Sequence, residues 1–152
     1  MRARALSLLA AIALAALVLG LASLAKAARG SGPKITSAKL VTDGGIRGTI
    51  DAGDEIRITF NRDIKIATLE SFGVDVVGDN GAMFRLTHES APYGCIPTVR
   101  GRTLTLAVNL DPWQVSSGPL TYPAQITHFW HVVGKDQGRP INLLGSRDRV
   151  IS

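Results

Sequence analysis

The side chains in this sequence with the greatest potential for chemistry are a few histidines, one cysteine and a series of aspartates. His128 and His131 are three residues apart, and His88 lies far upstream. On a helix the pair would share a face and could bind a metal, but on a strand an odd spacing places them on opposite faces. Because the residues around them are extended in character, we expect two ordinary strand histidines and no zinc or copper site.

Cys95 is the only cysteine, so the chain cannot form an internal disulfide. We expect it to be a small buried apolar residue, with a reactive thiol or an intermolecular bridge as the alternative. Ser116-Ser117-Gly118 lacks the Gly-x-Ser-x-Gly frame of a nucleophile elbow. We also find no paired carboxylates, phosphate loop or dinucleotide fingerprint. The sequence therefore predicts no catalytic residue and no cofactor-binding residue, and we expect that the protein is not an enzyme.

Aspartates recur in or near the predicted turns, and Asp51, Asp54 and Asp79 are the candidates for a calcium site. Calcium takes six or more oxygen ligands, and the chain has no Asp-x-Asp-x-Asp run. Aspartate also favours turns without any metal, because its side chain accepts hydrogen bonds from nearby backbone. We expect turn formation at these positions and keep calcium as the alternative.

Phe129 and Trp130 are adjacent within a run of extended sequence. Successive side chains of a strand point to opposite faces, so one of these rings must face outward. The outward ring is the candidate binding surface, for a protein partner or for a sugar ring.

The elements that position these residues are short strands. Ile56, Ile58 and Phe60 alternate with polar residues, as do the leucines of Thr103–Leu110, and Asn80-Gly81 is typical of a hairpin turn. We predict that the two alternating strands pack against each other across a sandwich, and that residues 90–97 form a loop. Turn signals about every 8–12 residues predict an all-β fold, a single antiparallel β-sandwich of seven to eight strands.

The first 27 residues are typical of an export segment. Arg2 and Arg4 precede an apolar run, and Ala25-Lys26-Ala27 matches an A-x-A cleavage site. The run is also long enough for a hydrophobic helix that stays in the bilayer as an anchor. We therefore divide the chain into residues 1–27, a signal peptide or membrane anchor; residues 28–33, a flexible tether; and residues 34–152, the β-sandwich domain.

The basic character of the chain belongs largely to this leader. The net charge is +5, but three of the 17 lysines and arginines and none of the 12 acids precede residue 28. The remaining cations are scattered singly, which argues against a nucleic-acid partner. We expect membrane contact only through the N-terminal segment.

The order of landmarks resembles the bacterial Ig-like domains of S-layer and adhesin proteins. Gly53-Asp54 opens a strand that ends in phenylalanine, a late strand carries Tyr122, and Asp136-Gln137-Gly138-Arg139 follows as a turn. Arg139 stands where that family usually has asparagine, and residues 78–100 match no pattern. The resemblance implies an Ig-like sandwich with an extracellular role and implies no catalytic residue.

Together these features predict an exported, non-catalytic Ig-like module with a structural or adhesive role at the cell surface or in the envelope. It would be secreted, or membrane-anchored if the leader is not cut. Its partner would be another protein or a second copy, joined through an edge strand, with residues 28–36 as a candidate donor arm. The alternative is a module that binds a cell-wall glycan or calcium.

Overall fold

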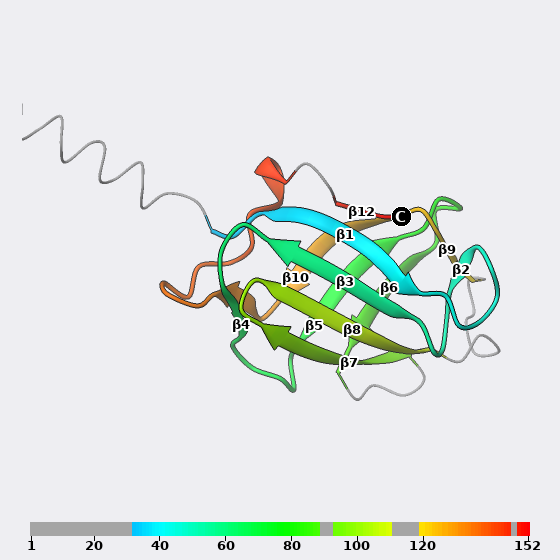
Figure 1. Cartoon of the computed structure of the whole chain (residues 1–152), viewed down its shortest axis with the longest axis horizontal. Helices are drawn as coiled ribbons and strands as arrows, with labels where there is room; N and C mark the ends of the chain where they lie inside the picture. Colours follow the sequence, from blue (N-terminus) through cyan, green and yellow to red (C-terminus); the bar gives the residue numbers. More distant parts are fainter. Residues whose placement is uncertain (1–31, 89–92, 111–118, 147–148) are drawn as a thin grey trace, which may run out of the picture. The chain divides into compact units, whose positions relative to one another are not determined.

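The computed structural model describes residues 32–88, 93–110, 119–146 and 149–152, and these residues form an all-β unit (Figure 1). The predicted leader and the start of the tether lie outside them, as do residues 111–115, where Asp111-Pro112 favours the start of a helical turn. Within the described residues no helix is long and apolar enough to cross a bilayer. The strands are β1 (Ile35–Thr42), β2 (Thr49–Ile50), β3 (Glu55–Phe60), β4 (Ile64–Ile66), β5 (Gly73–Val77), β6 (Met83–Thr87), β7 (Tyr93–Arg100), β8 (Thr103–Leu110), β9 (Leu120–Thr121), β10 (Ala124–Trp130), β11 (Val132–Gly134) and β12 (Val150–Ile151), with a 3₁₀ turn at Leu143–Gly145.

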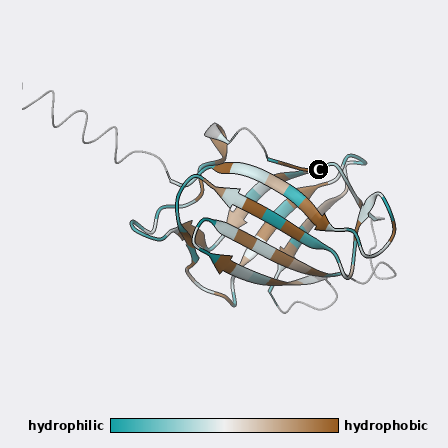
Figure 2. Cartoon of the chain, in the orientation of Figure 1, coloured by the Kyte–Doolittle hydropathy of each residue, from teal (hydrophilic) through white to brown (hydrophobic). Residues whose placement is uncertain are grey.

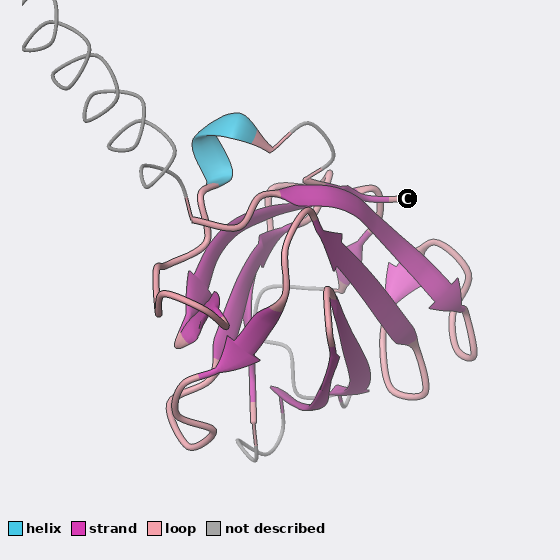
Figure 3. Cartoon of the chain, turned by 60° about the vertical axis from the view of Figure 1, so that its left-hand side comes forward, coloured by secondary structure: helices cyan, strands magenta, loops and turns pink. Residues whose placement is uncertain are grey.

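Eight of the strands form one sheet in the order β1-β3-β8-β7-β6-β5-β10-β12. The sheet curls until its two outer strands meet, because the Leu40 N–H of β1 donates to the Ser152 carbonyl just after β12, at 3.1 Å. Figure 3 shows the strands wrapped around a common interior. The sheet is mixed and nearly barrel-shaped, since β6 and β7 run parallel at Thr87 and Gly94 and the other pairs are antiparallel.

The apolar faces of the alternating strands line this interior. Figure 2 shows hydrophobic and hydrophilic residues alternating along β3 and β8. Ile56, Ile58 and Phe60 are buried, as predicted from their spacing. The predicted packing across a sandwich is wrong, however, because β3 and β8 are hydrogen-bonded neighbours with Ile56 opposite Leu106 and Ile58 opposite Leu104. Two strands with matching apolar faces can pair side by side as readily as face to face, and the alternation alone does not distinguish the two arrangements.

The predicted Asn80-Gly81 hairpin is confirmed. β5 and β6 pair in register around it, and Gly81 has a φ of +80°, which glycine adopts at no steric cost. The predicted loop at residues 90–97 is wrong for its second half, because residues from Tyr93 onward belong to β7 despite Pro97. The extended run that contains Phe129 and Trp130 is divided into three strands, β9, β10 and β11, with breaks at Pro123 and at His131.

Candidate functional site

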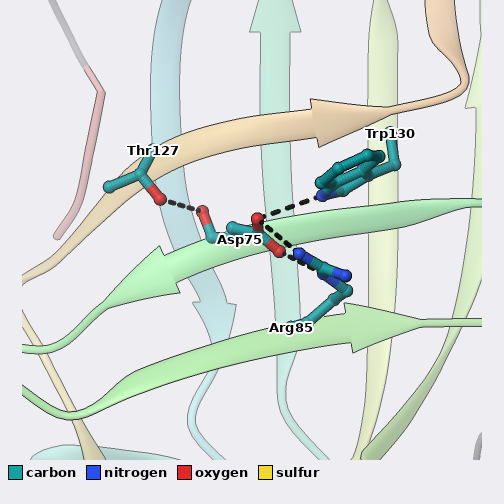
Figure 4. Close-up of polar contacts among 4 residues, drawn as sticks. All are labelled: Asp75, Arg85, Thr127 and Trp130. Atoms are coloured by element: carbon teal, nitrogen blue, oxygen red, sulfur yellow. Dashed lines mark hydrogen bonds and ion pairs between the residues drawn. The ribbon is translucent and has the colours of Figure 1, made fainter.

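The outer face of β5, β6 and β10 carries a cluster of polar and aromatic side chains around Trp130. Asp75 lies at its centre, with Arg85 on one neighbouring strand and Trp130 on the other (Figure 4). The Arg85 Nε donates to Asp75 Oδ1 at 2.6 Å, and the Trp130 indole N–H donates to Asp75 Oδ2 at 3.0 Å. Thr127 adds a hydrogen bond to the Asp75 carbonyl at 3.2 Å. Three strands are therefore connected by side chains as well as by their backbone ladder.

The register of the sheet produces this cluster. Asp75 and Arg85 stand directly opposite each other, equally far from the Asn80 turn. Opposite charges at such positions stabilise antiparallel pairs. On the other side of β5, Trp130 of β10 is paired with Gly73. A Cβ on Gly73 would lie 3.3 Å from the indole. The missing side chain at Gly73 allows the indole to approach the sheet surface closely.

A β-bulge in β10 decides which aromatic ring faces outward. The register against β5 shifts between Ile126 and His128, so Thr127 is an extra residue in the strand. Beyond the bulge the inward positions change from even to odd numbers. Phe129 is consequently buried, 8% exposed, and packs edge-to-face on Phe60 with ring centroids 5.7 Å apart. Trp130 is 39% exposed and is the outward ring that the sequence required.

The indole is held in place by charged and aromatic neighbours. The Arg85 guanidinium carbon lies 4.5 Å from the ring centroid, which is cation–π geometry. The His128 ring lies 4.5 Å away, tilted by 56°. Burial raises the pKa of Asp75, but hydrogen bonds from Arg85 and Trp130 together with the charge of Arg85 outweigh this, so its pKa lies below the ordinary value. The cluster thus presents a fixed tryptophan beside an arginine and a histidine.

His131 and Cys95 do not join this cluster. His131 follows the end of β10 with a φ of +57° and is exposed, so it is not part of the same strand as His128. In the part of the chain that the structure describes, no three His, Cys, Asp or Glu side chains converge. Cys95 is buried in the core, as expected, and burial raises the pKa of its thiol to about 12. A thiol with so high a pKa is a poor nucleophile.

Two of the calcium candidates accept hydrogen bonds from neighbouring backbone N–H groups. Asp54 is 2% exposed, and its two carboxylate oxygens accept the N–H groups of Gly44 and Asp51 at 2.8 and 2.9 Å. Asp51 is also buried and accepts from the Ile46 N–H and the Thr49 hydroxyl through one oxygen. Its second oxygen has no hydrogen-bond partner among the described residues, and it packs so close to Gly45 that a Cβ there would lie 1.7 Å away.

Within the described ranges, Asp79 is not hydrogen-bonded to these two aspartates or to their partners. It is exposed in the β5–β6 turn and accepts a hydrogen bond from the Thr121 hydroxyl. The backbone hydrogen bonds of Asp51 and Asp54 are the turn-forming role expected for aspartate, whereas the donor to Asp79 is 42 positions away in the sequence. The three calcium candidates are therefore divided between a buried pair that organises residues 43–54 and a surface residue that connects the hairpin turn to β9.

Arg85 and Asp75 were not identified as site residues from the sequence. The signal that could have found them was present: once Asn80-Gly81 is accepted as the hairpin turn, residues 75 and 85 are opposite each other by symmetry. The place of Trp130 beside them could not be found that way, because it depends on the bulge and on the pairing of β10 with β5. The chain matches no family model, no curated protein and no solved structure in these comparisons.

Proposed function

We propose that this chain is an exported, non-catalytic binding module with a structural or adhesive role at the cell surface or in the envelope. Its contact surface would be the outer face of β5, β6 and β10. The observation that carries the proposal is a partly exposed Trp130 held by Asp75 and stacked on Arg85. Tryptophan and arginine are the residues most often found at the energetic centre of protein interfaces. A ring whose orientation is already fixed also loses little conformational entropy when a partner binds.

The predicted export segment and the arrangement of the sheet support this role. The sheet has two four-stranded halves, β1-β3-β8-β7 and β6-β5-β10-β12. Among the described residues, their edges are joined by one parallel pairing at Thr87 and Gly94 and by the Leu40–Ser152 hydrogen bond. Two halves with so few connections are compatible with the two layers of an Ig-like sandwich. Domains of that kind present binding surfaces on a rigid framework.

Site-specific photo-cross-linking in the source organism tests the proposal. A photoreactive phenylalanine at exposed His128, beside Trp130, should yield a discrete adduct with a partner protein, and Trp130→Ala in the same chain should abolish it. The same photoreactive residue at Asp136, in an exposed turn between other strands, is the control and should yield none. Adducts from position 136 with none from position 128 would refute the contact surface.

A glycan ligand is the second candidate, favoured by the outward indole, since exposed aromatic rings of a β-sandwich can stack on sugar rings. A glycan array probed with the native chain and with Trp130→Ala separates the two candidates. Binding to defined wall glycans that disappears with Trp130→Ala would favour the glycan. The calcium form of this alternative has less support, because both oxygens of Asp54 and one oxygen of Asp51 accept hydrogen bonds from backbone and hydroxyl donors. An increase in melting temperature on adding calcium, reversed by EDTA, would support the calcium alternative.

A further inference from the structure

The edge of β7 that faces away from β8 is paired over only part of its length. β8 pairs with β7 from Tyr93 to Arg100. On the other side β6 reaches β7 only at Thr87 and Gly94, and no further pairing to this edge occurs among the described residues. A strand edge of this kind is a template for an added strand.

The hydrogen-bond pattern shows which backbone groups this edge presents. Val108 of β8 exchanges hydrogen bonds with the turn before β3, so its backbone points away from β7. Bonding and non-bonding pairs alternate along antiparallel strands. Val108 is opposite Cys95, and the next two β8 residues of the same kind, Leu106 and Leu104, are opposite Pro97 and Val99. The backbone groups of these three β7 residues therefore point away from β8. Pro97 therefore sits where its missing N–H costs β8 nothing, and Val99 offers an outward N–H and carbonyl.

A hollow of about 300 Å³ adjoins this edge. Three of its lining side chains are apolar and two are lysines: Ile64, Ile66, Val99, Lys65 and Lys135, with the backbone of Gly101. Neither lysine forms an ion pair with a described residue. The Asp63 carboxylate is the nearby opposing charge, 3.7 Å from the position of a Cβ on Gly101. The hollow thus combines an apolar floor with two available ammonium groups.

We propose that this edge binds an extended, acidic segment of a partner protein, which adds a strand alongside β7 at Val99. Main-chain hydrogen bonds to Val99 would supply affinity that does not depend on sequence. Alternate side chains of the segment would enter the hollow against Ile64 and Ile66, and an acidic side chain would pair with Lys65 or Lys135. Pro97 limits the added strand to a short length, because it removes one donor from the edge.

The test uses the full chain in a mild detergent and a fluorescent, end-capped hexapeptide of alternating valine and glutamate. Anisotropy should show saturable binding, and the double variant K65E/K135E should weaken it at least about tenfold, as expected when two charge pairs become repulsive. The matched peptide of alternating valine and lysine should bind the K65E/K135E variant more tightly than it binds the native chain. Absence of binding to the native chain, or equal binding of both peptides, would overturn the proposal.

A second pair of variants tests the added strand. Val99→Pro removes the outward N–H and should abolish peptide binding while near-ultraviolet circular dichroism is retained, whereas Val99→Thr should keep binding. If Val99→Pro unfolds, the charge-reversal result still decides. Undiminished binding to a folded Val99→Pro chain, or concentration-dependent dimers through this edge without peptide, would contradict the acidic-segment proposal. Trp130→Ala should leave peptide binding unchanged, because this edge lies on other strands.

Discussion

Asp54 is a charged residue in the core, and its surroundings explain why it is tolerated. Each carboxylate oxygen receives a backbone N–H, from Gly44 and from Asp51, so the loop before β3 is folded around this side chain. A buried carboxylate with such partners is stabilising, and removing one acceptor leaves a buried N–H without a partner.

Asp54→Asn should therefore lower the free energy of unfolding by about 1–3 kcal/mol, since one carboxylate oxygen becomes an NH₂ group facing an N–H donor. Asp136→Asn, in an exposed turn, is the matched control and should change it by less than roughly 0.5 kcal/mol. Urea denaturation of both variants measures this. Equal stability of the two variants would show that the Asp54 hydrogen bonds do not organise the loop.

Asp75 should give the native chain a pH dependence of stability. Its folded pKa lies below the ordinary value of 3.8, so its ionised form favours the folded state above that value, and this contribution is lost as the pH falls through the folded pKa. The stability difference between the native chain and Asp75→Asn should be constant above about pH 5 and shrink below it. Urea denaturation over this pH range should show that the stability difference between the native chain and Arg85→Gln also shrinks at low pH. A stability difference that does not depend on pH would contradict the ion pair.

At the residue scale, the sequence predicted burial better than it predicted partners. Phe60 was expected in the core from apolar alternation and Cys95 from its residue type, and both are buried there. The pairing of Asp75 with Trp130 depends on residues 55 positions apart, and no local pattern contains that information.

The bulge in β10 is the feature at the element scale that creates the candidate surface. Ile126 is opposite Val76 and His128 is opposite Asp75, with Thr127 unpaired between them. If Thr127 were present but paired regularly, without the register shift, an unbroken alternation from Ile126 would turn Trp130 inward and Phe129 outward. The sequence predicted that one ring faces out, but the choice depended on a bulge that leaves no reliable local signal.

Deleting Thr127 should therefore preserve the fold, because it restores regular pairing and keeps Phe129 inward and Trp130 outward. Deleting Gln125 is the matched control. It would turn Ile126 outward and should cost about 2–5 kcal/mol, as for the loss of a buried isoleucine. Thermal unfolding and tryptophan fluorescence report both outcomes. If the Thr127 deletion unfolds the chain and the Gln125 deletion does not, the bulge does not determine which residues of β10 face inward.

β7 shows why one strand was missed. Proline, glycine and cysteine within residues 93–97 interrupt any alternation, so the segment resembles a loop. The proline is tolerated because its nitrogen faces the partly unpaired edge, a fact that depends on the order of the strands.

At the scale of the whole molecule, the closing contact between β1 and β12 defines the sheet. Ile151 of β12 is fully buried, and the Leu40 N–H bonds to the next residue, Ser152. The sequence predicted an all-β fold and the spacing of its strands, but not that they would join into one nearly closed sheet. Closure brings together residues more than 100 positions apart, beyond the range of turn and alternation patterns.

Ile151→Ala should consequently cost about 2–5 kcal/mol, a large part of the stability of a domain without disulfides. Val150→Ala changes the exposed neighbour on the same short strand and should have little effect. Chemical denaturation of the two variants measures the difference. A small effect at Ile151 would mean that β12 does not contribute to the core.

Phe60→Ala tests the core at the end of β3 and should cost about 3–5 kcal/mol, because Phe60 is buried and packs on Phe129. Trp130→Ala should cost much less, since Trp130 lies on the outer face. Melting temperatures of the two variants compare core and surface directly. Equal losses would place Trp130 in the structural framework instead of on a binding surface.

The measurement that tests the central claim most directly is the retention of Trp130→Ala by the envelope of the source organism. We predict that a tagged full-length Trp130→Ala chain is exported at native levels and keeps its melting temperature within a few degrees. The fraction bound to the envelope after washing should fall at least about tenfold, as for loss of an interface hot spot, and Val150→Ala should leave it unchanged. Native retention of a folded Trp130→Ala chain would contradict the assignment of this face as the binding surface.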